Sequence, residues 1–533
     1  MKSRFVCEFN EPVVETKAGK VRGFHWRDTY QFRGIRYGRA ERFMMPEKEE
    51  AWEGIRDCFC YGRTAPTIDN TELQHIDTAM GFRFWPQSED CLFLNVWTQN
   101  IGGGAKKPVM FFIHGGRFAN GSCLEHEVYE AENLCKDGDV VVVSINHRLN
   151  ILGFLDLSQY GEKYWNSGNA GLADIVLALE WVRDNIAAFG GDPDNVTIFG
   201  QSGGGAKVSA IMQIPQAAGL YHKAIIQSGV LTSRDFPEDP ERNQAVAKAV
   251  VGKLGLDKDS IDRIQTLSYQ ALSDAFLEAV PDLEAAGINC DWAPVRNEYY
   301  KGMPNENEMT EQTKNTPVII GTNFAEELLW RDTFYDRAMP QEEKLALLEK
   351  KFGPRYTELL EKFRKAYPEK DILDLMSYDT FFRAPSLHYI DKRAAASQAP
   401  VYAYIFAYDF HFFGGQPAFH AAEHSIVFKS YERLPLMEDP GIPLLSDQMA
   451  GAWAAFAHTG NPENPYLTKW QPYKKGDEHI MVFSQMSGQR GDFDRELVEL
   501  KEELEPTGYH ASYLQMAMER KKEKAQENNS GTN

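Results

Sequence analysis

The fold is decided by the stretch Val196-Thr197-Ile198-Phe199-Gly200-Gln201-Ser202-Gly203-Gly204-Gly205-Ala206. Residues that favour β-structure are followed by small residues that suit the start of a tightly packed helix. Residues 200–204 fit G-x-S-x-G, in which a serine lies on a sharp turn between a strand and a helix. Flanking glycines give such a turn room, and a helix N-terminus favours developing negative charge. The stretch therefore predicts Ser202 as a nucleophile, but a match this short needs support from the rest of the chain.

Buried strands alternate with helices on both sides of this stretch. Continuous apolar runs, typical of strands buried on both faces, occupy residues 108–113, 140–146, 224–229, 317–321 and 401–406. Between Gly168 and Ala188, apolar residues recur at helical spacing. This alternation predicts an α/β protein with a mostly parallel central sheet flanked by helices. Functional groups in such sheets lie at the carboxyl ends of the strands, which is where Gly115 and Gly200 fall.

The composition argues against several classes of protein. A formal net charge of -20 disfavours nucleic-acid binding, which needs a basic patch. The chain contains no apolar run near the roughly 20 residues that span a bilayer. Residues 1–10 lack the apolar core of a secretory signal. We therefore expect a cytoplasmic protein with neither a nucleic-acid partner nor a membrane partner.

The cysteines and the C-terminal residues bear on compartment and domain organisation. Seven cysteines in 533 residues form an odd, sparse set unlike a disulfide framework, which again favours a reducing cytoplasm. We expect residues 1–518 to form a single catalytic domain. Residues 519–533 are charged and then rich in small polar residues, so they are expected to form a disordered tail.

A serine nucleophile needs a base, and the base needs an orienting acid. On an α/β-hydrolase sheet these groups follow in the order serine, acid, histidine. Glu326 follows the apolar run 317–321, with Glu327 as the alternative acid, and His420 follows the run 401–406. The amides of Gly116 and Gly203 are suitable donors for an oxyanion. The chain thus offers every part of a serine hydrolase.

Several further segments match one known family. They are Phe32-Arg33-Gly34-Ile35, Glu89-Asp90-Cys91-Leu92-Phe93-Leu94-Asn95, His114-Gly115-Gly116, Asn146-His147-Arg148-Leu149, Gly191-Asp192-Pro193, Gln227-Ser228-Gly229 and Thr459-Gly460-Asn461-Pro462. With the G-x-S-x-G turn, they resemble type-B carboxylesterases, which include cholinesterases and p-nitrobenzyl esterases. The resemblance extends from near residue 13 to about residue 475. It implies an α/β-hydrolase fold, hydrolysis of small-molecule esters through an acyl-enzyme, and no cofactor or metal.

The resemblance also implies roles for particular residues. The implied triad is Ser202 as nucleophile, Glu326 as acid and His420 as base. The implied oxyanion donors are the amides of Gly116, Arg117 and Gly203. Ser228 matches a serine that lies near the triad acid in the family.

Several positions depart from the family pattern, among them Arg36, which replaces a usual Pro. Gln201 stands where most members have Glu, which weakens the case for a cationic substrate. Arg117 replaces a small residue, and its guanidinium could recognise an anionic group or could instead be solvated or salt-bridged. Ala65 stands near the position where secreted relatives carry the disulfide partner of Cys91, so the resemblance implies that Cys91 lacks that bond.

Two other functions stay open. A non-catalytic binding protein can share this fold, because fold does not determine function. His420-Ala421-Ala422-Glu423-His424 fits H-x-x-E-H, a zinc-peptidase motif, although nearby glycines and a proline argue against the long helix that this motif needs. A phosphate loop is disfavoured because Ala206 separates Gly205 from Lys207. The sequence leaves the natural substrate and the oligomeric state open.

Overall fold

The computed structural model describes residues 11–68, 80–230, 232–233, 236–328, 336–467 and 469–505. The expected tail at 519–533 lies outside these residues and stays a prediction. The single domain expected for residues 1–518 likewise stays a prediction.

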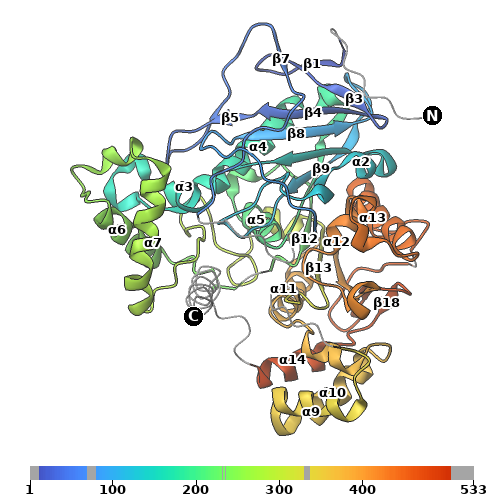
Figure 1. Ribbon diagram of the computed structural model, residues 1–533. Coiled ribbons are helices and arrows are strands. Elements are labelled where there is room, and N and C mark those ends of the chain that lie inside the picture. The colour runs from blue at the N-terminus through green and yellow to red at the C-terminus, as the bar shows by residue number, and fades with distance from the viewer. Residues whose placement is uncertain are drawn as a thin grey trace, which may run out of the picture.

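In the described part of the chain, an 11-stranded sheet is the centre of the molecule (Figure 1), in the order β18-β17-β14-β13-β12-β11-β9-β10-β8-β4-β3. Its parallel strands are β10 (Val141–Ile145), β9 (Lys107–Ile113), β11 (Gly191–Gln201), β12 (Lys223–Gln227), β13 (Val318–Asn323), β14 (Val401–Phe406) and β17 (Ile480–Phe483). Antiparallel strands complete both edges: β8 (Phe93–Thr98), β4 (Thr29–Arg36) and β3 (Phe24–Trp26) on one, and β18 (Gly488–Arg490) on the other. The predicted mostly parallel sheet is confirmed.

Shorter strands lie outside this sheet. β1 (Val13–Glu15), β2 (Lys20–Arg22) and β7 (Ile55–Asp57) form a three-stranded sheet near the N-terminal end of the described chain. Two small pairs are β5 (Gly38–Arg39) with β6 (Glu47–Lys48), and β15 (Asp409–Phe410) with β16 (Gln416–Pro417).

Helices flank the central sheet. Those nearest to it are α2 (Glu132–Gly138), α3 (Asn150–Phe154), α4 (Ala170–Asn185), α5 (Gly203–Ile211), α11 (Arg383–Ala396), α12 (Glu423–Val427) and α13 (Ile442–Thr459). The helix expected between residues 168 and 188 is α4, which is followed by a short 3-10 turn at Ile186–Phe189. Gly190 then turns the chain with φ +78° into β11.

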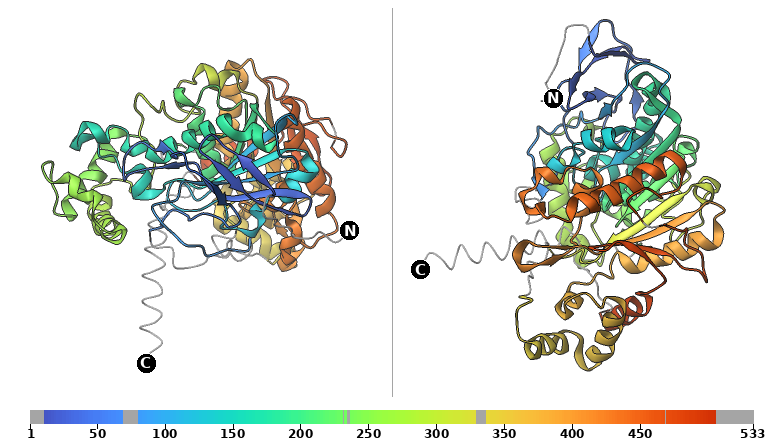
Figure 2. Two further views of the ribbon diagram at one scale, coloured as in Figure 1. Left: turned by 90° about the horizontal axis from the view of Figure 1, so that it is seen from above. Right: turned by 90° about the vertical axis from the view of Figure 1, so that its right-hand side faces the viewer.

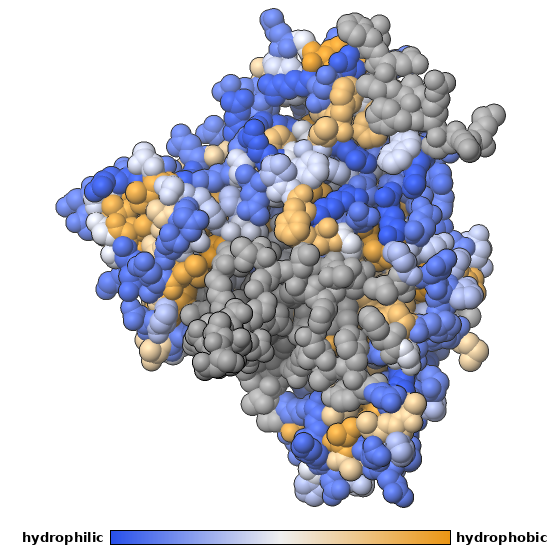
Figure 3. All heavy atoms as spheres, viewed as in Figure 1, coloured by the Kyte–Doolittle hydropathy of each residue, from blue (hydrophilic) through white to orange (hydrophobic). Residues whose placement is uncertain are grey.

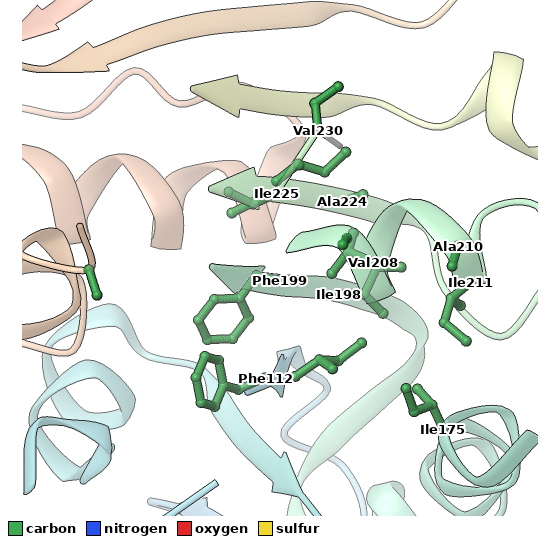
Figure 4. Packing of buried hydrophobic residues seen from close by; sticks show 14 of the residues in the cluster. Phe112, Ile175, Ile198, Phe199, Val208, Ala210, Ile211, Ala224, Ile225 and Val230 are labelled. Carbon is green, nitrogen blue, oxygen red and sulfur yellow. The ribbon is translucent and has the colours of Figure 1, made fainter. Parts of the chain in front are cut away.

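The strands are apolar on both faces because helices cover both. Figure 4 shows Phe112 and Phe199 pointing to one side of the sheet, and their rings lie 5.2 Å apart. Ile198 points to the other side, where it meets Val208 of α5. All of these side chains are fully buried. Successive residues of one strand therefore join two separate apolar layers, which holds the end of β11 firmly in place.

The remaining helices project beyond the sheet, as Figures 1 and 2 show. They are α6 (Pro240–Lys253) and α7 (Tyr269–Ala285) on one side, and α9 (Gln341–Phe352), α10 (Tyr356–Ala366) and α14 (Arg495–Leu504) on another. The short α8 (Glu311–Asn315) precedes β13 in the chain. Hydrophilic residues dominate the described surface in Figure 3, with smaller hydrophobic areas between them. Within the described residues, every helix is too short or too polar to cross a bilayer.

Candidate active site

Ser202 lies on the turn between β11 and α5, with φ 56° and ψ -127°. Its amide donates a hydrogen bond of 2.8 Å to the carbonyl of Gln227 on β12. A Cβ atom added to Gly204 would lie 2.2 Å from the carbonyl oxygen of Ile113, and one added to Gly200 would lie 2.5 Å from it. Only glycine lets the turn approach β9 this closely, so the G-x-S-x-G pattern has a steric cause here.

The chain that leaves β9 packs directly against this turn. A Cβ atom added to Gly203 would lie 2.1 Å from the backbone nitrogen of Arg117. Gly116 and Arg117 both have left-handed backbone conformations, with φ values of +79° and +54°. The carbonyl of Gly116 accepts hydrogen bonds from the amides of Ala119 and Asn120. The structure thus brings the backbones of Gly116, Arg117 and Gly203 together beside Ser202.

Glu326 and His420 form a buried pair. Glu326 follows β13, and its Oε2 lies 2.6 Å from Nδ1 of His420. Its other oxygen accepts hydrogen bonds from the Ser228 hydroxyl at 2.6 Å and from the Asn323 amide at 2.7 Å. The neighbouring Glu327 is half-buried. Of the two carboxylates offered by the sequence, Glu326 is therefore the one bonded to His420.

Burial shapes the ionisation of this pair. It lowers the pKa of His420, which favours the neutral imidazole that a general base requires. It also raises the pKa of Glu326, while hydrogen bonds from Ser228 and Asn323 oppose that shift. The His420 ring stacks against Phe382 at a centroid distance of 5.2 Å, so the orientation of the imidazole is held from two directions.

A second buried carboxyl group lies close to Glu326. Glu423 accepts hydrogen bonds from the side-chain amides of Gln227 at 3.2 Å and Asn323 at 2.5 Å. Burial, followed by the charge of Glu326, raises the pKa of Glu423 to about 7. Asn323 therefore donates hydrogen bonds to both carboxyl groups. Its position at the end of an apolar strand could have suggested this role, which sequence reasoning missed.

Gln201 and Arg117, the two unusual neighbours of Ser202, have definite partners. The Gln201 amide nitrogen lies 3.3 Å from Nδ1 and 3.2 Å from Nε2 of His420. Arg117 forms an ion pair of 3.1 Å with Asp291, and its guanidinium lies 5.1 Å from the ring centre of Phe236. The salt-bridged alternative for Arg117 is the one observed.

The H-x-x-E-H segment does not form a continuous helix. Ala421 has φ +64°, and α12 begins only at Glu423. The ring of His424 packs against Phe112, with centroids 5.8 Å apart, and against Tyr129, with centroids 5.0 Å apart. His420 and His424 therefore lack the shared helical face on which this zinc motif depends.

Comparisons with known proteins show which proteins this chain is similar to. The model of the carboxylesterase family matches residues 10–497. The para-nitrobenzyl esterase of Bacillus subtilis is 34% identical over 88% of this chain and 94% of its own length. A solved esterase from Clostridium hathewayi is described as able to hydrolyse aliphatic aromatic polyesters, and its sequence is 42% identical to this chain. The match covers 94% of this chain and 100% of the solved chain, with a TM-score of 0.90. A carboxylesterase from Geobacillus stearothermophilus, 31% identical, covers 92% of this chain with 99% of its own and gives a TM-score of 0.72.

Proposed function

Because this chain belongs to the carboxylesterase family and is a carboxylic ester hydrolase, we propose that it cleaves esters through an acyl-enzyme formed on Ser202. The observation that carries this proposal is the buried hydrogen bond of 2.6 Å between His420 Nδ1 and Glu326 Oε2. With Nδ1 bonded to Glu326, Nε2 is the ring nitrogen proposed to accept the Ser202 proton. Gln201, the residue before Ser202, lies against the same ring, which supports His420 as the base for Ser202.

In the first half-reaction, His420 accepts the Ser202 proton as Oγ attacks the ester carbonyl carbon. The tetrahedral intermediate then collapses, the bond to the alcohol oxygen breaks, and His420 returns its proton to the leaving alcohol. In the second half-reaction, His420 takes a proton from water, the resulting hydroxide attacks the acyl carbon, and Ser202 leaves with the proton. Glu326 stays ionised and stabilises the imidazolium in both halves.

The negative charge of each tetrahedral intermediate needs hydrogen-bond donors. The amides of Gly116, Arg117 and Gly203 are the proposed donors, since their backbones meet beside Ser202. Such donors act on charge that exists only in the transition state and its intermediates. They are therefore expected to raise kcat more than they lower KM.

The first prediction tests the nucleophile. Ser202→Ala is expected to abolish hydrolysis of a short p-nitrophenyl ester, because without the hydroxyl no acyl-enzyme forms. Ser209→Ala is the matched control, since Ser209 is a buried serine on α5 whose hydroxyl has no hydrogen-bond partner among the described residues. Retained activity in Ser202→Ala contradicts the serine mechanism.

Strong inhibition of the wild type by a chelator favours a zinc hydrolase, and failure of a fluorophosphonate to label Ser202 favours a binding protein.

We also propose that the protein works in a reducing cytoplasm. The six described cysteines, Cys58, Cys60, Cys91, Cys123, Cys135 and Cys290, are free thiols, as expected where glutathione keeps thiols reduced. Alkylation of freshly isolated protein without a reductant, followed by mass spectrometry, measures the number of free thiols. A disulfide at Cys91 contradicts the proposal.

A further inference from the structure

Lys207 is a buried cation directly behind the loop that carries the proposed oxyanion donors. It lies on α5 and is 0% exposed. Its ammonium donates hydrogen bonds of 3.1 Å to the carbonyl of His114 and 3.1 Å to the carbonyl of Gly115. We infer that Lys207 is a positioning residue, which holds these two carbonyls so that the amide of Gly116 points toward Ser202. The inference rests on the proposed function.

The planarity of the peptide bond carries the first step. In a trans peptide, the C=O group and the following N–H group point in opposite directions. Since the carbonyl of Gly115 points at Lys207, the amide of Gly116 points away from it. A Cβ atom added to Gly115 would lie 3.7 Å from Cβ of Ser202, so this peptide lies next to the nucleophile.

The next peptide along the loop is oriented in a different way. The carbonyl of Gly116 accepts the amides of Ala119 at 3.2 Å and Asn120 at 2.9 Å, and this contact directs the amide of Arg117. Backbone groups alone therefore orient the second donor. The first donor depends on a side chain, because the contacts described for the Gly115 carbonyl come from Lys207 and from the His114 ring. Lys207 is the charged one of these two.

The surroundings of Lys207 do not offset the burial of its charge. Its hydrogen bonds within the described residues go to carbonyls and to no carboxylate, and only Glu125 favours the charged form. His114 and His147 stack at 4.9 Å beside it, and burial keeps the pKa of both far below its usual value. Burial lowers the pKa of Lys207 itself to about 7. An apolar side chain here would leave the carbonyls of His114 and Gly115 without this donor, so the ammonium fixes how these two groups are oriented.

The experiment replaces the ammonium and separates kcat from KM. Lys207→Met keeps the length and removes the donor, and it is expected to lower kcat about 100-fold, because loss of one oxyanion donor costs about 10²–10³ in kcat. KM should change by less than about twofold, since the donor acts on the transition state and not on the bound ester. Lys207→Gln keeps a neutral N–H donor and is expected to lower kcat about tenfold. Because Lys207→Met leaves two buried carbonyls without this donor, its melting temperature is measured in parallel and its kcat is determined well below that temperature.

A transition-state analogue gives an independent measurement. A trifluoromethyl ketone forms an anionic tetrahedral adduct with the serine, so its affinity should fall in Lys207→Met by the same factor as kcat/KM. Lys392→Met is the matched control, because Lys392 also donates only to backbone carbonyls in the described contacts, those of Pro304, Asn305 and Asn307. Its kcat should stay within about twofold of the wild type, since the hydrogen bonds described for Lys392 involve none of the proposed oxyanion donors.

Two outcomes overturn the inference. One is an unchanged kcat in Lys207→Met, or in Lys207→Gln if the methionine variant does not fold. The other is a loss of activity that appears in KM instead of kcat, or that disappears when kcat is measured well below the melting temperature, because a structural role alone produces it. Failure of the proposed function gives a different result: the wild type itself has no esterase activity, or Ser202→Ala remains active.

Discussion

Gln201 connects the nucleophile turn to the base at the scale of single residues. Its amide nitrogen lies 3.2 Å from Nε2 of His420, and both side chains are buried. Gln201 is uncharged, so it adds no negative charge beside the imidazole. The carboxylate hydrogen-bonded to the ring is Glu326, at 2.6 Å, and the charge of Glu423 also favours the imidazolium.

A second prediction changes that charge. Gln201→Glu is expected to raise the pKa of His420 by about one unit, because an adjacent negative charge favours the imidazolium. The base must be neutral, so the acid limb of the kcat/KM profile should move to higher pH. Gln270→Glu, the same substitution on the exposed surface of α7, should leave the profile unchanged. An acid limb that stays in place or moves to lower pH in Gln201→Glu contradicts the proposed effect of the charge at this position.

The third prediction concerns Arg117. Its charge is engaged by Asp291 at 3.1 Å, and it is close enough to His420 to lower the pKa of that group. Asp291→Asn is expected to release the guanidinium and to raise the preference for esters with an anionic acyl group over neutral ones by about fivefold, the equivalent of about 1 kcal/mol. Arg117→Ala should remove that gain. If neither variant changes the ratio of kcat/KM values across an ester panel, Arg117 does not select substrates.

At the scale of elements, the site depends on how closely β11, its turn and α5 approach β9. The turn can form only where the residues after Ser202 lack side chains, since Gly204 faces the carbonyl of Ile113. The same closeness brings the loop at Gly116 and Arg117 against Gly203. The packing of the strands and the arrangement of the proposed oxyanion donors therefore depend on the same close approach.

A fourth prediction follows for Gly204. Gly204→Ala is expected to destabilise the fold by about 1–3 kcal/mol, because a Cβ atom forced against backbone strains a packed core, and to lower activity because the turn must move. The control is Gly252→Ala on α6, where an added Cβ atom meets nothing within 4 Å; it should be neutral or stabilising by up to about 1 kcal/mol. Urea unfolding measures both. Equal stabilities would show that β9 can move aside.

At the scale of the whole molecule, a buried ion pair joins α14 to the sheet's helical layer. Asp494 accepts hydrogen bonds from Arg383 of α11 at 2.9 and 3.0 Å. It also accepts the hydroxyls of Tyr367 at 3.1 Å and Tyr378 at 2.9 Å. Arg383 and Asp494 are both completely buried. This cluster fastens the C-terminal end of the described chain to the segment that follows β13 and the triad acid.

The fifth prediction tests this cluster. Asp494→Asn is expected to lower the free energy of unfolding by about 3–5 kcal/mol, because it leaves the Arg383 charge buried without its partner. The control is Glu496→Gln on the same helix, whose carboxylate pairs with Lys362 at the surface and whose loss should leave stability nearly unchanged. Thermal unfolding measures both. A small effect at Asp494 would mean that water reaches the guanidinium.

Local patterns in the sequence were sufficient to predict the mostly parallel sheet and the G-x-S-x-G turn, and the resemblance to a known family supplied the expected chemistry. Runs such as 108–113 and 401–406 are apolar because both faces of the strand are covered, so they predict buried parallel strands. The glycines around Ser202 likewise form a short pattern, because only glycine lets the turn approach β9 closely. Each of these features leaves its mark within a short stretch of the chain, which is why the sequence alone was enough to predict it.

Only the tertiary structure decided which charges meet. Arg117 and Asp291 are far apart in the chain, and nothing local to either predicts their ion pair. In the sequence, Lys207 was only the lysine of a failed phosphate-loop pattern; folding places its ammonium under the carbonyls of His114 and Gly115. Such contacts depend on how α5 packs across the end of β9, and packing joins residues that the sequence keeps separate. The turn at Ser202 could thus be found from the sequence, whereas the groups proposed to tune it could be found only in the folded chain.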